Sequence, residues 1–146
     1  MIFQTILIAL LVVAVSVIGY RFITGIWPGS RVIIQEPPEN VPQVSDKNAN
    51  FMIFYTEWCP YSQKAMEEWK SFKQMMTNSP KTYGGKTITF EEIDADASKG
   101  RAAIYQVREY PTLKLQTKEK LYTMLGKPTP ASFKAFLVAA LGKESS

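Results

Sequence analysis

The sequence FMIFYTEWCPYS, residues 51–62, decides the fold. It opens with apolar, β-branched and aromatic residues, a composition typical of a buried strand. Residues 60–78 then carry apolar side chains at helical spacing. The single cysteine of the chain, Cys59, therefore stands where a strand passes into the N-terminus of a helix. Free backbone N–H groups and the helix dipole at such a position favour the thiolate, so they lower the pKa of the thiol.

The elements that follow alternate between strand and helix and close with a hairpin and a helix. Thr129 as the N-cap and Pro130 at the first helical position start the last helix. This order predicts an α/β domain with a mixed central sheet and helices on both faces. We interpret Met66, Met75 and Met76 of the first helix as core residues. The predicted ranges are 51–56, 60–78, 87–93, 98–107, 110–115, 121–124 and 130–141.

Residues 1–27 predict a transmembrane helix or signal anchor. Residues 2–20 are almost uniformly apolar, and at about 1.5 Å per residue they nearly match a bilayer core of about 30 Å. Tyr20 and Trp27 are suited to the membrane–water interface. A cleaved signal peptide is the alternative, with 17–19 as its cleavage motif, although no Lys or Arg precedes the apolar run.

The charges that flank this segment predict its orientation. Arg21 and Arg31 follow the apolar run, whereas only the amino terminus precedes it. The positive-inside rule then places the C-terminal domain on the cytosolic side of a single-pass membrane protein. Cleavage of a signal peptide would instead make the domain lumenal or secreted.

Composition separates the rest of the chain into a linker, a domain and a tail. Residues 28–50 are rich in proline and predict an extended linker. Within the linker, residues 31–35 favour a short strand, which pairs either with the sheet of the domain or with a partner. The domain is expected over residues 51–142, and residues 143–146 form a polar tail.

Charge and residue usage exclude several classes of function. The net charge is +4 with a pI near 9.1, but the basic residues are interleaved with acidic ones, a pattern unlike that of nucleic-acid-binding proteins. The absence of histidine removes His-based acid–base catalysis and nearly all zinc sites. One cysteine permits no internal disulfide. We expect no metal, no cofactor and no nucleic acid, with membrane lipid and one or more unidentified proteins as partners.

The pair Trp58-Cys59, followed about fifty residues later by Tyr110-Pro111-Thr112, resembles the thioredoxin superfamily. The resemblance covers about residues 50–142. It implies a minimal thioredoxin fold of order β-α-β-α-β-β-α, without the first strand–helix unit of thioredoxin itself. It also implies that Pro111 is the proline that follows a cis peptide bond beside the active site.

The same resemblance assigns roles to the residues around the cysteine. Cys59 matches the nucleophile, whereas Ser62 replaces the resolving cysteine and Ile53 replaces a buried carboxylate. Loss of a general base costs about 10²–10⁴-fold in a proton-transfer step. Without a resolving thiol, a mixed disulfide waits for an external thiol. The chain is therefore expected to be at most a weak monothiol exchange protein and not a dithiol reductase.

Other residues carry two interpretations. Trp58, Pro60, Tyr61 and Tyr110 either line a groove for an extended peptide or serve as packing residues. Cys-Pro-Tyr is also similar to glutaredoxins, but the sequence around Pro111 and after residue 124 departs from the glutathione-binding pattern of that group. Asp94 and Asp96 follow a predicted strand, so we interpret them as turn residues rather than as a catalytic pair.

Two functions from different classes follow. The first is a membrane-anchored thioredoxin-like protein that forms mixed disulfides with partner proteins through Cys59. The alternative is a non-catalytic docking protein of the same fold, which tethers an assembly to a membrane, for example in the virion of a large DNA virus.

Overall fold

The computed structural model describes residues 1–24 and 32–146, which belong to two compact units, residues 1–30 and 31–146. The first unit contains helix α1 (Ile2–Thr24). Within the described residues, only Ile2–Tyr20 is long and apolar enough to cross a membrane, a test that an N-terminal signal sequence also passes. Trp27, expected at the interface, and the start of the predicted linker lie outside the described residues.

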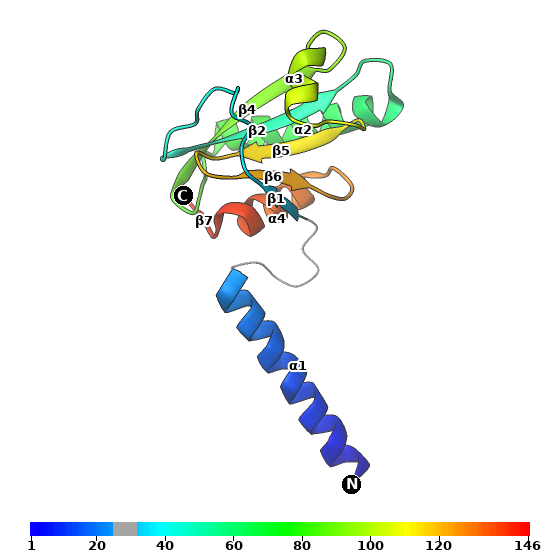
Figure 1. Ribbon diagram of the computed structural model, residues 1–146, viewed down its shortest axis with the longest axis vertical. Coiled ribbons are helices and arrows are strands. Elements are labelled where there is room, and N and C mark those ends of the chain that lie inside the picture. Colours follow the sequence, from blue (N-terminus) through cyan, green and yellow to red (C-terminus); the bar gives the residue numbers. More distant parts are fainter. Residues whose placement is uncertain (25–31) are drawn as a thin grey trace. The chain divides into compact units, whose positions relative to one another are not determined.

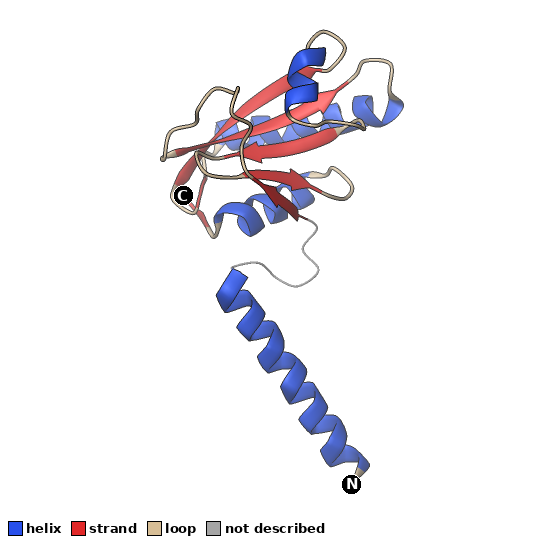
Figure 2. Cartoon of the chain, viewed as in Figure 1, coloured by secondary structure: helices blue, strands red, loops and turns tan. Residues whose placement is uncertain are grey.

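The second unit is a mixed sheet with helices on both faces, as predicted (Figures 1 and 2). The strand order is β1-β6-β5-β2-β4-β3-β7. Strands β2 and β4 run parallel, and every other neighbouring pair runs antiparallel. The helices are α2 (Pro60–Asn78), α3 (Lys99–Ile104) and α4 (Pro130–Leu141). The strands are β1 (Val32–Gln35), β2 (Asn48–Tyr55), β3 (Thr82–Tyr83), β4 (Lys86–Asp94), β5 (Thr112–Gln116), β6 (Leu121–Met124) and β7 (Glu144–Ser145).

Strand β1 answers the question that the sequence left open. It pairs antiparallel with β6 at one edge of the sheet, with Val32 opposite Met124. No helix lies between β1 and β2 in the described part of the chain, which agrees with a missing first strand–helix unit. The compact unit thus takes in β1 and the start of β2, both of which fall within the range 28–50 that composition assigned to a linker.

The C-terminal tail also joins the sheet. Its strand β7 pairs with β3, and the hydroxyl of Tyr83 donates a 2.9 Å hydrogen bond to the Glu144 carboxylate. The β3–β4 turn requires glycine at Gly84, whose φ is +55° and where a Cβ would lie 1.9 Å from the Leu141 carbonyl oxygen. The tail is therefore docked against the end of α4 and the β3–β4 hairpin.

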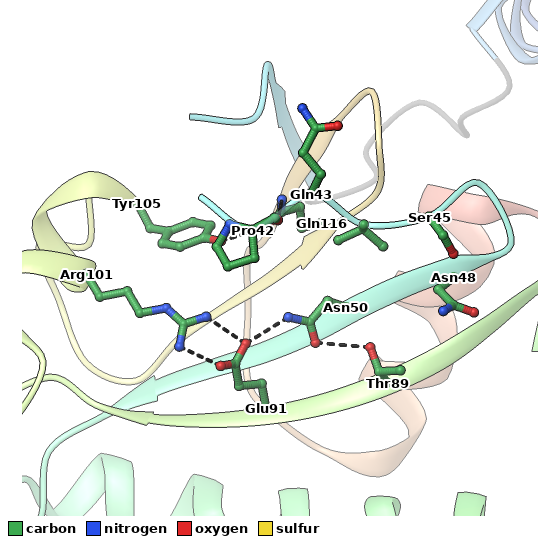
Figure 3. A pocket seen from close by; sticks show the side chains of 11 residues that line it. Pro42, Gln43, Ser45, Asn48, Asn50, Thr89, Glu91, Arg101, Tyr105 and Gln116 are labelled. Carbon is green, nitrogen blue, oxygen red and sulfur yellow. Dashed lines mark hydrogen bonds and ion pairs between the residues drawn. The ribbon is translucent and has the colours of Figure 1, made fainter. Parts of the chain in front are cut away.

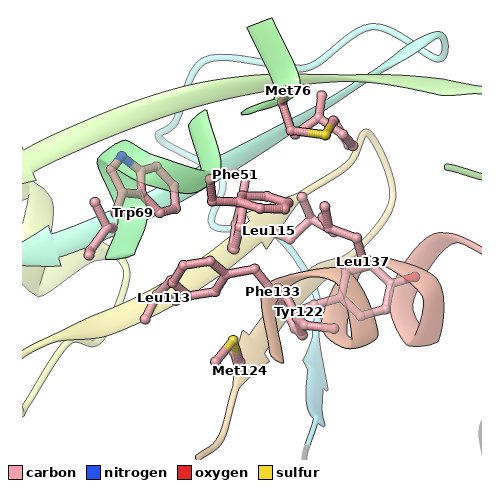
Figure 4. Packing of buried hydrophobic residues seen from close by; sticks show 14 of the residues in the cluster. Phe51, Trp69, Met76, Leu113, Leu115, Tyr122, Met124, Phe133 and Leu137 are labelled. Carbon is pink, nitrogen blue, oxygen red and sulfur yellow. The ribbon is translucent and has the colours of Figure 1, made fainter. Parts of the chain in front are cut away.

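The main core lies between the sheet and helices α2 and α4, and it is built around Phe51 (Figure 4). The Phe51 ring lies 4.8 Å from that of Trp69 on α2 and 5.8 Å from that of Phe133 on α4. Met66 and Met76 are buried, as expected of core residues. The same expectation is wrong for Met75, which is 39% exposed because it lies on the outer side of α2.

The opposite face of the sheet carries α3 and a polar network beside the segment that leads into β2 (Figure 3). The Glu91 carboxylate accepts hydrogen bonds from the Arg101 guanidinium and from the Asn50 amide. Gln116 accepts from the Tyr105 hydroxyl and donates to the Pro42 carbonyl. These polar groups are satisfied by one another, so the network fixes the proline-rich segment to the sheet.

Candidate functional site

Cys59 lies at the junction of β2 and α2. It is the N-cap of α2, in an extended conformation (φ −86°, ψ 118°), and its carbonyl accepts the first helical hydrogen bond, 3.0 Å from the Gln63 nitrogen. Pro60 at the first helical position has no N–H, so the amides of Tyr61 and Ser62 are the free donors beside the sulfur. Cys59 is 8% exposed and is therefore largely buried.

The pKa of the Cys59 thiol is lowered by these donors. The largest cause is the hydrogen bond from the backbone N–H of Ser62, and the N–H of Tyr61 and the hydroxyl of Ser62 act in the same direction. Partial burial opposes them, because it disfavours the charged thiolate. The pKa of the Cys59 thiol is thus lowered, in the direction that the sequence position favours.

Ser62, which stands in place of a resolving cysteine, is fully buried. Its hydroxyl oxygen accepts a hydrogen bond from the backbone N–H of Thr56, 3.3 Å away. Ile53 is also fully buried, within the apolar cluster of the α2 and α4 face. No carboxylate therefore occupies the place where the resemblance expects one.

The loop that precedes β5 meets the cysteine. The Tyr110–Pro111 peptide bond is cis, as the resemblance predicted. The Cys59 sulfur lies 3.8 Å from the carbonyl oxygen of Tyr110, within reach of a weak S–H hydrogen bond. The fold thus brings Cys59, Ser62 and Pro111 together from segments about fifty residues apart in the sequence.

Two aromatic side chains beside the cysteine are exposed to solvent. Trp58 is 67% exposed and Tyr61 is 78% exposed, so neither packs in the core. The indole N–H of Trp58 donates a 2.8 Å hydrogen bond to the Asp96 carboxylate. The Asp94 carboxylate accepts from the Asp96 backbone N–H, as expected of a turn residue. Sequence reasoning missed that Asp96 also holds Trp58, because no local pattern signals a contact across 38 residues.

A groove of about 550 Å³ runs beside the cysteine. Of the four residues predicted for a peptide groove, Tyr61 and Tyr110 line it, whereas Trp58 and Pro60 are not among its lining residues. Sequence reasoning missed the loop between β6 and α4, which forms the other wall with Lys127. The described residues contain no group of three or more Cys, Asp or Glu side chains placed to hold a metal ion.

These features can be compared with known proteins. The thioredoxin family model matches residues 34–139. The chain belongs to the thioredoxin family. The match begins inside β1, earlier than the resemblance in the sequence suggested. The chain is 31% identical over 84 residues to protein disulfide-isomerase A4 of Bos taurus. That alignment covers 57% of this chain but only 12% of the bovine protein.

Solved thioredoxin-family structures have the same fold. Human ERp44 superposes with a TM-score of 0.52 at 19% identity, over 63% of this chain and 27% of that one. The Trx4 domain of ERdj5 gives a TM-score of 0.53 at 17% identity, over 65% of this chain and 81% of that one. Identities this low establish the shared fold alone.

Proposed function

We propose that this protein is a membrane-anchored monothiol thioredoxin that forms mixed disulfides with partner proteins through Cys59. The observation that carries the proposal is a single thiol at a helix N-terminus, with donors that lower its pKa and a groove beside it. Similarity to a protein disulfide-isomerase supports chemistry of this class.

In the proposed step, the Cys59 thiolate attacks one sulfur of a partner disulfide. The bond between Cys59 and that sulfur forms as the partner's disulfide bond breaks, and the other sulfur leaves as a thiolate that takes a proton from water. The N–H of Ser62 and the Tyr110 carbonyl flank the reacting sulfur. Tyr61 and Tyr110 would contact the extended segment that carries the target disulfide.

Release from the mixed disulfide needs a second thiol. Ser62 has no sulfur with which to attack, and Cys59 is the only cysteine of the chain. An external low-molecular-weight or protein thiol must therefore supply the electrons. This favours capture and retention of partners over repeated reduction, so dithiol reductase activity is not expected.

The location is part of the same proposal. Residues 1–27, which contain helix α1, anchor the protein in a membrane, and the domain lies on the cytosolic side. Its apolar length over Ile2–Tyr20 supports the anchor. Extraction of the membranes at alkaline pH should leave the full chain in the pellet, and release of the intact chain into the supernatant would refute the anchor.

The trapping experiment tests the chemistry. The full-length protein in non-ionic detergent is mixed with a disulfide-containing peptide, and the covalent adduct is followed by mass spectrometry. We expect an adduct that persists until glutathione is added, and none with Cys59→Ser. Ser62→Cys is the matched variant, because its second thiol should discharge the adduct without glutathione. Absence of an adduct with the unmodified chain would refute the proposal.

A second candidate function, non-catalytic docking, is favoured by the free edge of the sheet. Strand β1 is the terminal strand, and Ile33 and Ile34 are 44% and 42% exposed. Such an edge can accept a further strand from a partner. Partner capture that survives Cys59→Ala and fails with Ile34→Lys would favour docking over thiol exchange.

A further inference from the structure

A basic pocket of about 340 Å³ lies on the sheet face opposite α2 and α4. It is separate from the groove beside Cys59, with which it shares no lining residue. Its walls come from β1, β5, β6 and the loop before β5. The lining includes Ile33, Gln35, Arg108, Glu109, Lys114 and Thr123.

Lys114 is the unusual member of this pocket, because it is only 3% exposed. It lies in a cross-strand row of Met52, Lys114, Thr123 and Ile33, which runs from β2 to the edge strand β1. Strand β1 and the neighbouring loop therefore cover a side chain that strand alternation alone would place in solvent.

The buried ammonium has an incomplete set of partners. Its Nζ donates one hydrogen bond, 2.8 Å long, to the Thr123 hydroxyl. The ion pairs of the described residues do not include Lys114. An ammonium carries three donors, and a buried charge without a counter-ion is costly. Burial lowers the pKa of Lys114, in agreement with this geometry.

The charged residues that line the pocket set the charge of a suitable ligand. The loop before β5 contributes Arg108 and Glu109, whereas β1 and β6 contribute only neutral side chains to the lining. Two cations and one anion leave a net charge of +1. A singly charged anion matches this balance, whereas a phosphate dianion would meet repulsion from Glu109.

We propose that this pocket binds a carboxylate, which pairs with the Lys114 ammonium while its attached carbon chain contacts Ile33 and Leu125. The carboxylate belongs to a small free acid, to an acidic side chain or to a polypeptide C-terminus. The site does not depend on the reactivity of Cys59. Because Glu109 and Thr112 flank the Tyr110–Pro111 bond, a bound carboxylate adjoins the loop that contacts Cys59.

The test observes the lysine side chains of the full-length protein directly. The protein is labelled with ¹³C at lysine Cε and kept in non-ionic detergent, and the Lys114 signal is identified by its loss in Lys114→Met. Sodium isobutyrate is added at constant ionic strength, with neutral isobutyramide as the control ligand. We expect the chemical shift of the Lys114 signal to change and to saturate at millimolar isobutyrate. The pKa of Lys114 should rise, because a bound anion favours the charged amine.

Matched variants separate the site from a general salt effect. Arg108→Gln should weaken isobutyrate binding about tenfold. Lys118→Met should leave it unchanged, because that lysine is exposed and pairs with Asp46 outside the pocket. Cys59→Ser should also leave it unchanged, so the result is independent of the thiol chemistry. An unmoved Lys114 signal, or an equal response to isobutyramide, would overturn the proposal.

Two further ligands identify the source and class of the anion. Short peptides that carry either a free C-terminal carboxylate or one internal glutamate with blocked ends are added in turn. Binding of either one supports the site and names the source of the carboxylate. Tighter binding of inorganic phosphate than of isobutyrate would overturn the assignment of a singly charged ligand.

Discussion

Removing the Ser62 hydroxyl should affect both stability and the cysteine. The oxygen is fully buried, accepts from the Thr56 N–H, and helps to lower the pKa of Cys59. Ser62→Ala keeps the Cβ and favours the helix, so the change removes one oxygen atom and little else. A merely vestigial serine would tolerate this substitution without loss.

The expected magnitude follows from the contacts. Thr56 is 1% exposed, so its N–H would be left buried without this partner. A buried N–H without a partner costs about 1–3 kcal/mol. The hydrogen bond from Thr56 to Ser62 is long, at 3.3 Å, so its loss should cost an amount near the lower limit of that energy range. The better helix propensity of alanine returns about 0.5 kcal/mol. We therefore expect a net loss of about 1 kcal/mol in the free energy of unfolding.

The pKa of the Cys59 thiol should rise only in part. The backbone N–H of Ser62, the largest cause of the lowered value, is retained in Ser62→Ala. Urea unfolding followed by tryptophan fluorescence measures the stability, and alkylation rates against pH measure the thiol. Ser71→Ala, at an exposed position of the same helix, is the control. The reasoning is refuted if the two variants agree in both measurements.

Three other substitutions test the core and the charged groups by the same unfolding assay. Phe51→Ala, at the centre of four aromatic contacts, should cost about 3–5 kcal/mol, and a loss below about 1 kcal/mol would contradict the described packing. The Arg101 guanidinium holds the pKa of Glu91 below its ordinary value. The resulting stabilisation is about 1 kcal/mol. It is present above the pKa of Glu91 in the unfolded chain and is lost as the pH falls through the lower pKa of Glu91 in the folded chain. Glu91→Gln should therefore remove this dependence of stability on acid pH. Lys114→Met should stabilise the protein by about 1–2 kcal/mol at neutral pH. Because the pKa of Lys114 is lowered on folding, that gain should disappear as pH rises to the unfolded value of 10.5, and a gain independent of pH would contradict a buried charge.

Local sequence signals predicted the elements that hold the site. Helix α2 begins at Pro60, because proline is favoured at the first helical position and Cys59 before it is extended. The apolar positions of α2 repeat at helical spacing. The Thr129 side chain caps α4 through the Ser132 N–H, as the sequence indicated. These features depend on neighbours in sequence, so they were accessible without the structure.

Contacts between distant segments were not accessible in the same way. Lys114 is buried although it lies on the opposite face of β5 from Leu113 and Leu115, and β1, which lies far from it in the sequence, contributes to the pocket around it. The hydrogen bond from Trp58 to Asp96 joins two turns that lie 38 residues apart, and no local pattern in either turn indicates the contact. The sequence indicates only that Ser62 replaces a thiol, whereas its burial and the hydrogen bond from Thr56 give its hydroxyl a structural role.

The reactivity of the Cys59 thiol tests the central claim most directly. Alkylation rates of the full-length protein in non-ionic detergent are measured against pH, with Cys59→Ser as the blank. We predict a midpoint below about 8.5, the ordinary value of an unperturbed thiol, because amides at the N-terminus of α2 stabilise the thiolate. A midpoint at or above about 8.5, with slow alkylation, would contradict the proposal that this thiol captures disulfide-bonded partners.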